Sequence, residues 1–84
     1  MTKIEIYSTE FCPYCIRAKQ LLDNKNAHYV EIRVDTDKSK LVEMLRRSQG
    51  RRSVPQIFIN DVGIGGFDDL AALESSGKLN EMLG

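Results

Sequence analysis

The sequence predicts an α/β protein in which helices flank both faces of a four-stranded mixed sheet, with the element order β-α-β-α-β-β-α. Two observations support this prediction. Strand-like and helix-like segments follow one another along the chain. In the strand-like segments apolar and polar residues alternate, and in the helix-like segments the apolar residues fall at helical spacing. The first strand, helix and strand form a right-handed parallel crossover, and the last two strands form an antiparallel hairpin.

The size and charge of the chain exclude several classes of protein. Its 84 residues suffice for one small domain, so a single domain is expected over residues 1–84. Twelve basic residues balance twelve acidic ones, which argues against a dedicated nucleic-acid or membrane-surface binder. No apolar run approaches the roughly 20 residues that span a bilayer, and the N-terminus lacks the apolar core of a signal peptide. We therefore expect a cytoplasmic protein without nucleic-acid or membrane partners, and we predict a monomer.

The first half of the chain supplies a strand, a helix and a second strand. Residues 3–7, KIEIY, alternate with a period of two and predict the first strand. From Pro13 to about Lys25 the apolar residues fall at helical spacing. Proline suits the first helical turn because it has no N–H to leave unpaired. Residues 29–34, YVEIRV, alternate again and predict the second strand.

The second half supplies a helix, a hairpin and a further helix. The Asp-Thr-Asp stretch at 35–37 offers capping oxygens for a helix that Gly50 ends. Residues 54–60, VPQIFIN, predict a third strand that opens with a proline, and the Asn-Asp pair before VGIG at 62–65 predicts a hairpin. The stretch GGFDDLAAL at 65–73 begins the last helix, which SSG interrupts before a final amphipathic turn.

Both cysteines of the chain, Cys12 and Cys15, lie in the stretch TEFCPYC, between the first predicted strand and helix. Ligand sites of open α/β sheets gather at this end of the strands. A zinc site needs three or four protein ligands, whereas this chain has two Cys and a single His, His28, which we place on the surface away from the cysteines. We expect no metal. A structural crosslink over so short a loop would remove little entropy from the unfolded chain, and the cytosol keeps such crosslinks rare.

Redox chemistry fits the pair better. Helical residues three apart have Cα atoms about 5–5.5 Å from each other, within the range of a disulfide. A thiolate at a helix N-terminus gains up to about 2 kcal/mol from the helix dipole. We therefore expect the pKa of the Cys12 thiol to lie below that of free cysteine and the pKa of Cys15, one turn inside, to be nearer normal. A stable thiolate is also a good leaving group, so the site is suited to passing disulfides on.

The segments CPYC, SVPQIFI and IGGFDDL, in this order, resemble the glutaredoxins, and most of all the small bacterial dithiol kind. The resemblance extends from about Lys3 to Leu83. It implies a thioredoxin-like fold and an enzyme of electron transport and cell redox homeostasis, with glutathione as co-substrate and no tightly bound cofactor. Cys12 would attack disulfide-containing or glutathionylated proteins, and Cys15 would resolve the mixed disulfide formed with a protein substrate.

The resemblance also implies a glutathione site. Val54 would offer backbone partners, and Pro55 would be a cis-proline that faces the cysteines. The helix start at Phe67 and Asp68 would meet a carboxylate, and Asp68 would meet the amine. The expected glutathione-binding residues are Thr9, Tyr14, Arg51, Ser53, Val54, Pro55, Gly66, Phe67 and Asp68.

Several assignments leave alternatives open. Thr9 stands where many relatives carry a lysine, so Arg51 or Arg52 would have to supply the positive charge. Simple helix capping is the alternative for one of Asp68 and Asp69. At the level of function, the alternatives are a glutathione-assisted iron–sulfur cluster carrier, against which CPYC counts, and a thioredoxin-type reductant, against which Tyr14 and the GG-x-D-D element count.

Overall fold

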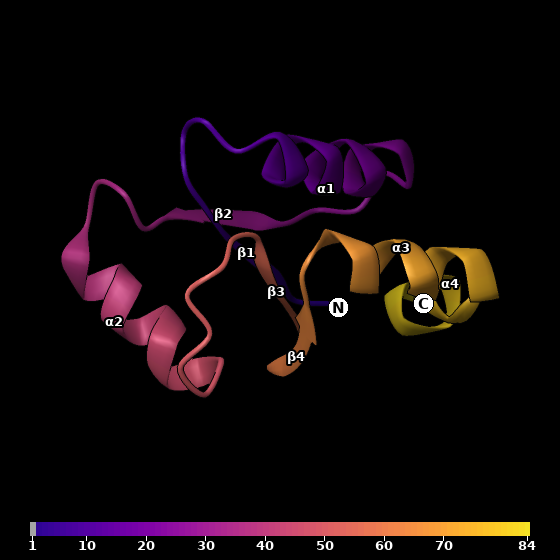
Figure 1. Cartoon of the computed structure of the whole chain (residues 1–84). Coiled ribbons are helices and arrows are strands. Elements are labelled where there is room, and N and C mark those ends of the chain that lie inside the picture. The colour runs from indigo at the N-terminus through magenta and orange to yellow at the C-terminus, as the bar shows by residue number, and fades with distance from the viewer. Residues whose placement is uncertain (1) are drawn as a thin grey trace.

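The computed structural model describes residues 2–84, which form four strands and four helices (Figure 1). The predicted element order is confirmed, and the final amphipathic turn is a short helix. Gly77, with a φ of 81° in the left-handed region, separates it from the helix before. In chain order the elements are β1 (Ile4–Ser8), α1 (Pro13–Asn24), β2 (Val30–Arg33), α2 (Lys38–Arg47), β3 (Gln56–Ile59), β4 (Val62–Gly65), α3 (Phe67–Ser76) and α4 (Lys78–Leu83).

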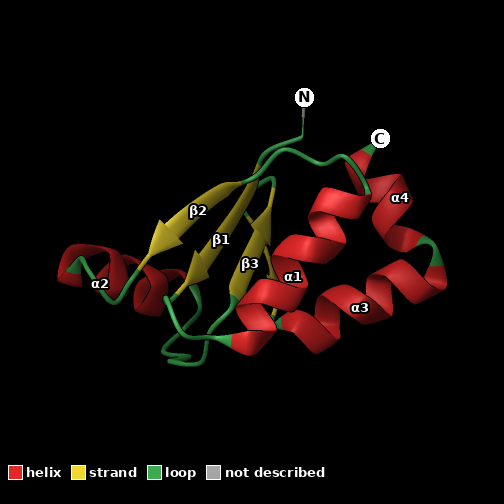
Figure 2. Cartoon of the chain, turned by 90° about the horizontal axis from the view of Figure 1, so that it is seen from above, coloured by secondary structure: helices red, strands yellow, loops and turns green. Residues whose placement is uncertain are grey.

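The sheet is mixed, and its strand order is β2-β1-β3-β4 (Figure 2). β1 runs parallel to β2 and antiparallel to β3, with Ile6 opposite Ile57. β3 and β4 form the predicted hairpin. Its turn residues Asn60 and Asp61 both have positive φ, 51° and 66°. Two such residues give the type I′ geometry that matches the twist of the flanking strands.

Helices cover both faces of the sheet, and the period of β1 decides which residues they meet. Ile4 and Ile6 point to the face that α1, α3 and α4 cover, whereas Tyr7 points to the face under α2. The first cluster consists of Ile4, Ile6, Ala18, Leu22, Ile57, Ile59, Leu70 and Leu79. The second consists of Tyr7, Val34, Met44 and Phe58. Among residues 2–84, no helix combines the length and apolar character that crossing a bilayer requires.

The cysteine loop is tied to the edge strand on its way from β1 to α1. The N–H of Val34 donates to the carbonyl of Ser8 at 3.0 Å, which extends the parallel pairing by one step. The N–H of Glu10 donates to Asp35 Oδ2 at 3.1 Å. Arg33 donates to the same carboxylate at 2.8 and 2.6 Å. The loop that carries Cys12 is therefore anchored through Glu10 to the carboxylate of Asp35, and Arg33 holds that carboxylate in place.

Candidate active site

The two cysteines are joined in a disulfide at the start of α1, with their Cα atoms 5.2 Å apart. Cys12 is the N-cap of the helix, with extended backbone angles, and its Sγ accepts a 3.1 Å hydrogen bond from the N–H of Cys15. Cys12 keeps 8% of its surface exposed, whereas Cys15 is fully buried. Pro13 takes the first helical position, so the chain begins its helix directly behind the outer sulfur.

A second loop approaches the pair from β3. The Val54–Pro55 peptide bond is cis, as the resemblance implied. The carbonyl oxygen of Val54 lies 3.7 Å from Sγ of Cys12, and Pro55 is buried. The expectation that this proline lies beside the cysteines is therefore consistent with the contact between the loop and the outer sulfur.

Gln56 stabilises this loop through hydrogen bonds to Ser53, a role that the sequence pattern did not predict. Its side chain is 2% exposed, and Nε2 donates to the carbonyl of Ser53 at 2.9 Å and to Ser53 Oγ at 3.1 Å. A buried amide needs such partners, since an unpaired polar group in the interior is costly. The available signal was a single glutamine in an otherwise apolar strand, directly after Val54-Pro55.

An open pocket of about 260 Å³ lies between this loop and the start of α3. It gathers all but one of the residues expected at a glutathione site, and Asp69 in addition. Thr9 and Arg52 are not among its lining residues. The lining consists of Tyr14, Arg51, Ser53, Val54, Pro55, Gly66, Phe67, Asp68 and Asp69.

The two acids at the start of α3 have different roles. Asp69 Oδ2 accepts from the N–H of Gly66 at 3.0 Å, so Asp69 caps the turn into the helix. Gly65 has a φ of 111°, and a Cβ there would collide with the Asp69 carboxylate, so this position requires glycine. Asp68 is exposed and forms no hydrogen bond or ion pair with any of residues 2–84. Its carboxylate remains available to a ligand.

Aromatic side chains form one wall of the pocket. The rings of Tyr14 and Phe67 lie 6.3 Å apart with 32° between their planes. The Arg17 guanidinium sits over the Tyr14 ring, 5.6 Å from its centroid. These contacts connect the first turn of α1 to the first residue of α3, so the wall spans the two helices whose N-termini border the pocket.

Charged groups next to the cysteine loop are paired. Hydrogen bonds from Arg33 are the largest cause that holds the pKa of Asp35 well below its usual range, and the Glu10 N–H adds to the effect. Glu31 accepts from Lys19 at 2.8 Å and from Ser8 Oγ at 2.6 Å, and these two bonds, in that order, lower its pKa. Both carboxylates are therefore ionised at neutral pH, and the anchor of the loop does not change with pH there.

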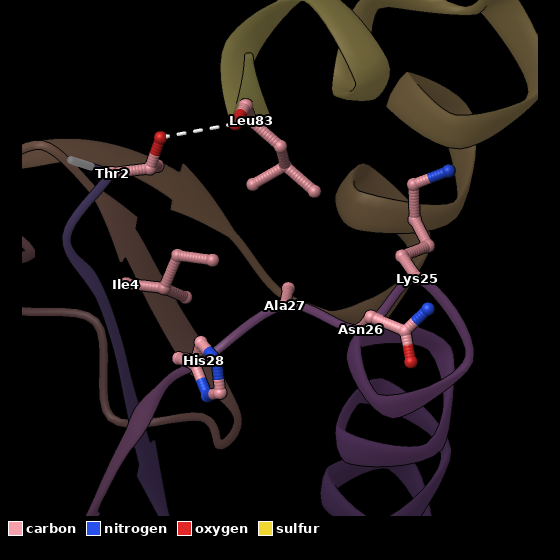
Figure 3. A pocket seen from close by; sticks show the side chains of 7 residues that line it. All are labelled: Thr2, Ile4, Lys25, Asn26, Ala27, His28 and Leu83. Carbon is pink, nitrogen blue, oxygen red and sulfur yellow. Dashed lines mark hydrogen bonds between the residues drawn. The ribbon is translucent and has the colours of Figure 1, made fainter.

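Another pocket, of about 250 Å³, lies at the opposite end of the sheet, where β1 and β2 begin (Figure 3). Neither this pocket nor the previous one is lined by a cysteine, but the previous one includes Val54, whose carbonyl contacts Cys12. Lys25 on the rim of the present pocket pairs with Glu74 at 2.9 Å. His28 lines it and is exposed, as expected. Nowhere in the described range 2–84 do three His, Cys, Asp or Glu side chains gather in a way that could hold a metal ion.

Comparisons with known proteins agree with this geometry. The family model described as Glutaredoxin matches residues 4–64. Glutaredoxin 3 of Escherichia coli K12 is 49% identical over 83 residues, which cover 99% of this chain and 99% of that protein.

Solved structures give the same result. The solution structure of glutaredoxin from Brucella melitensis is 48% identical, with a TM-score of 0.85 over 99% of this chain and 89% of that one. A crystal structure of a buckwheat glutaredoxin–glutathione complex is 33% identical, with a TM-score of 0.87 over 98% of this chain and 76% of that one. The thioredoxin-like fold predicted from the sequence is therefore confirmed.

Proposed function

This chain belongs to the glutaredoxin family, and on that basis we propose that it is a glutathione-dependent thiol–disulfide oxidoreductase. It reduces protein disulfides and mixed disulfides of glutathione through Cys12 and Cys15. The observation that carries the proposal is the asymmetry of the pair: Cys12 reaches the surface at the N-terminus of α1, and Cys15 is fully buried one turn inside.

The reducing half-reaction starts at the outer sulfur. The Cys12 thiolate attacks one sulfur of the substrate disulfide, forms a mixed disulfide and expels the other sulfur as a thiolate, which takes up a proton. Cys15 then loses its proton and attacks the Cys12 sulfur. The second substrate thiol leaves, and the Cys12–Cys15 disulfide remains. Two electrons have passed from the enzyme to the substrate, and the 5.2 Å between the two Cα atoms lets this disulfide form within one helical turn.

Two molecules of glutathione restore the dithiol. The first attacks Cys12, so that Cys15 leaves as a thiol and glutathione remains attached to Cys12. The second attacks the sulfur of the bound glutathione, which releases oxidised glutathione and the Cys12 thiolate. The hydrogen bond from the Cys15 N–H stabilises Cys12 as this leaving group.

The pocket beside Cys12 is the proposed glutathione site, and a buckwheat relative solved with glutathione supports it. The exposed backbone at Val54 would pair with the extended tripeptide. The free N–H groups at the start of α3 would bind one carboxylate, and Asp68 would bind the amine. Arg51 lines the pocket and would supply the positive charge that Thr9 lacks. Thr9 itself, which is absent from the lining, would contribute little.

A coupled assay tests the proposal. The protein is given glutathione, glutathione reductase, NADPH and the mixed disulfide of cysteine and glutathione, and the oxidation of NADPH is followed. Wild-type protein is expected to turn over, and Cys12→Ser is expected to have no activity. Full activity of Cys12→Ser, or equal turnover with thioredoxin reductase in place of the glutathione system, would refute it.

The carrier alternative has its own measurement. Protein purified without oxygen is expected to be colourless and to elute as a monomer of 9.5 kDa. A persistent brown dimer would instead favour an iron–sulfur carrier. We also propose that the protein is monomeric and cytoplasmic.

A further inference from the structure

Two large apolar side chains are exposed next to Cys12, and neither of them lines the glutathione pocket. Phe11 keeps 90% of its surface exposed and Ile16 keeps 47%. Neither side chain packs into one of the two core clusters. Soluble proteins rarely expose large contiguous apolar patches, and such patches mark surfaces that contact another molecule.

These side chains border a cavity that opens directly onto the reactive position. The cavity measures about 270 Å³ and is lined by Glu10, Phe11, Cys12, Pro13 and Ile16. Apart from Glu10 at its edge, the lining offers apolar side chains and the cysteine itself. The glutathione pocket shares no residue with it. Cys12 itself lines the apolar cavity, whereas its contact with the glutathione pocket is through the carbonyl of Val54, 3.7 Å from Sγ.

We propose that this apolar cavity seats the residues next to the attacked cysteine of a protein substrate, so that the enzyme prefers cysteines with apolar neighbours such as Leu or Phe. The inference rests on the proposed function and names its substrate class. The redox step is the one described above, in which the substrate disulfide breaks as the bond to Cys12 forms, so no further reactant is required.

The occupant follows from where the substrate sulfur must go. Attack brings this sulfur onto Cys12, and each neighbouring residue of an extended substrate lies about 3.3 Å further along its backbone. Phe11 is bonded directly to Cys12, and Ile16 lies one helical turn from it. The first residues beside a substrate cysteine therefore meet the cavity. Glutathione has no apolar side chain and would gain nothing from it.

The test compares two small peptides, each closed by one disulfide. In one peptide Leu and Phe flank the cysteines, and in the other Ser takes their places. Protein reduced beforehand with dithiothreitol reacts with each peptide in a single turnover. We expect the wild type to reduce the apolar peptide about tenfold faster, since burying part of a Phe or Leu side chain has an effect of this size.

Two variants and one control locate the preference. Phe11→Ser and Ile16→Ser are expected to bring the rate ratio of the two peptides close to one, while their turnover of the cysteine–glutathione mixed disulfide stays at the wild-type level. Val42→Ser, which removes an apolar side chain on α2 that is 60% exposed, is expected to keep the ratio. Equal rates in the wild type, or a ratio that survives both cavity variants, would overturn the inference.

The experiment also separates this inference from the proposed function. Failure of the glutathione-coupled assay would count against glutathione as reductant. The single-turnover rates do not involve glutathione and would still report the peptide preference.

Discussion

The backbone N–H of Cys15 donates a 3.1 Å hydrogen bond to Sγ of Cys12, across the first turn of α1. In the reduced protein the same N–H would face a thiolate, and hydrogen bonds to charged groups contribute about 1.5–3 kcal/mol. The helix dipole acts in the same direction. Both effects favour the charged form of Cys12 and do not reach the buried Cys15 sulfur to the same extent.

The first prediction concerns the ionisation of Cys12. The rate of alkylation by iodoacetamide follows the thiolate fraction, so its dependence on pH gives the pKa. We expect the Cys15→Ser variant, in which Cys12 is the reactive thiol, to show a midpoint below that of free cysteine, because the helix start and the N–H of residue 15 favour the thiolate. A midpoint equal to that of free cysteine in the same buffer would mean that the helix start does not activate the sulfur.

The second prediction separates the two cysteines by function. Cys15→Ser is expected to keep activity on glutathionylated substrates, because Cys12 can exchange with glutathione alone. The same variant should lose activity on intramolecular protein disulfides, whose mixed disulfide needs the inner thiol for its resolution. Both rates are measured in the glutathione-coupled assay. Equal loss on both substrate types would show that Cys15 also takes part in the exchange with glutathione.

The third prediction tests the free carboxylate of the pocket. Asp68→Lys replaces an attraction for the amine of glutathione by a repulsion, so the glutathione concentration for half-maximal rate should rise several-fold. Glu81→Lys makes the same change of charge on α4, outside the pocket, and serves as the control. If the two variants behave alike, the effect is one of net charge and Asp68 has no contact with glutathione.

The fourth prediction concerns stability and rests on Arg47, the last residue of α2, whose side chain contacts residues of the sheet. Its guanidinium donates to both carboxylate oxygens of Glu5 at 3.0 and 3.1 Å and to the hydroxyl of Tyr7 at 2.8 Å. It also lies 4.0 Å from the centroid of the Phe58 ring. The side chain is 22% exposed, so water screens these contacts only in part.

Arg47→Ala should therefore lower the free energy of unfolding by about 2–3 kcal/mol, because Glu5 and Tyr7 lose a charged partner in a half-buried site. Arg46→Ala, the neighbouring exposed arginine on α2, should change it by less than about 0.5 kcal/mol. Urea unfolding followed by circular dichroism gives both values. Equal midpoints for the two variants would contradict the assigned role of Arg47.

The fifth prediction concerns pH. The pKa of Glu31 is lowered in the folded protein, mainly by the hydrogen bond from Lys19, so its carboxylate stabilises the fold above its unfolded pKa. This contribution is lost as the pH falls through the folded pKa. Glu31→Gln should cost at most about 1 kcal/mol at pH 7, given partial exposure, and the difference from wild type should shrink in acid. A difference independent of pH would assign the effect to packing.

Much of the fold could be predicted from the chain because its signals are local. Pro13 marks a helix start through its missing N–H, and the alternation of apolar and polar residues in β1 and β2 identifies both segments as strands. The Asn60-Asp61 turn carries its own hairpin signal. The register of the central strands depends on contacts between distant segments, and the local patterns contain no information about it.

In the candidate site, too, residues in local motifs could be predicted from the sequence, whereas those that depend on the folded structure could not. Residues in contiguous motifs, such as Val54 with Pro55 and Phe67 with Asp68, were identified and do line one pocket. Thr9 is a predicted site residue because it lies three residues before Cys12, but it does not line the pocket. Gln56 was overlooked because its importance comes from burial, which a pattern of residue types does not reveal.

The glutathione pocket and the apolar cavity at Cys12 have no lining residue in common. With the roles proposed for these two pockets, the use of glutathione and the choice of protein substrate can change independently of each other. Substitutions at positions 11 and 16 are therefore expected to change which protein substrates are preferred without changing the reaction with glutathione. The start of α1 is thus a suitable place for altering substrate specificity by design.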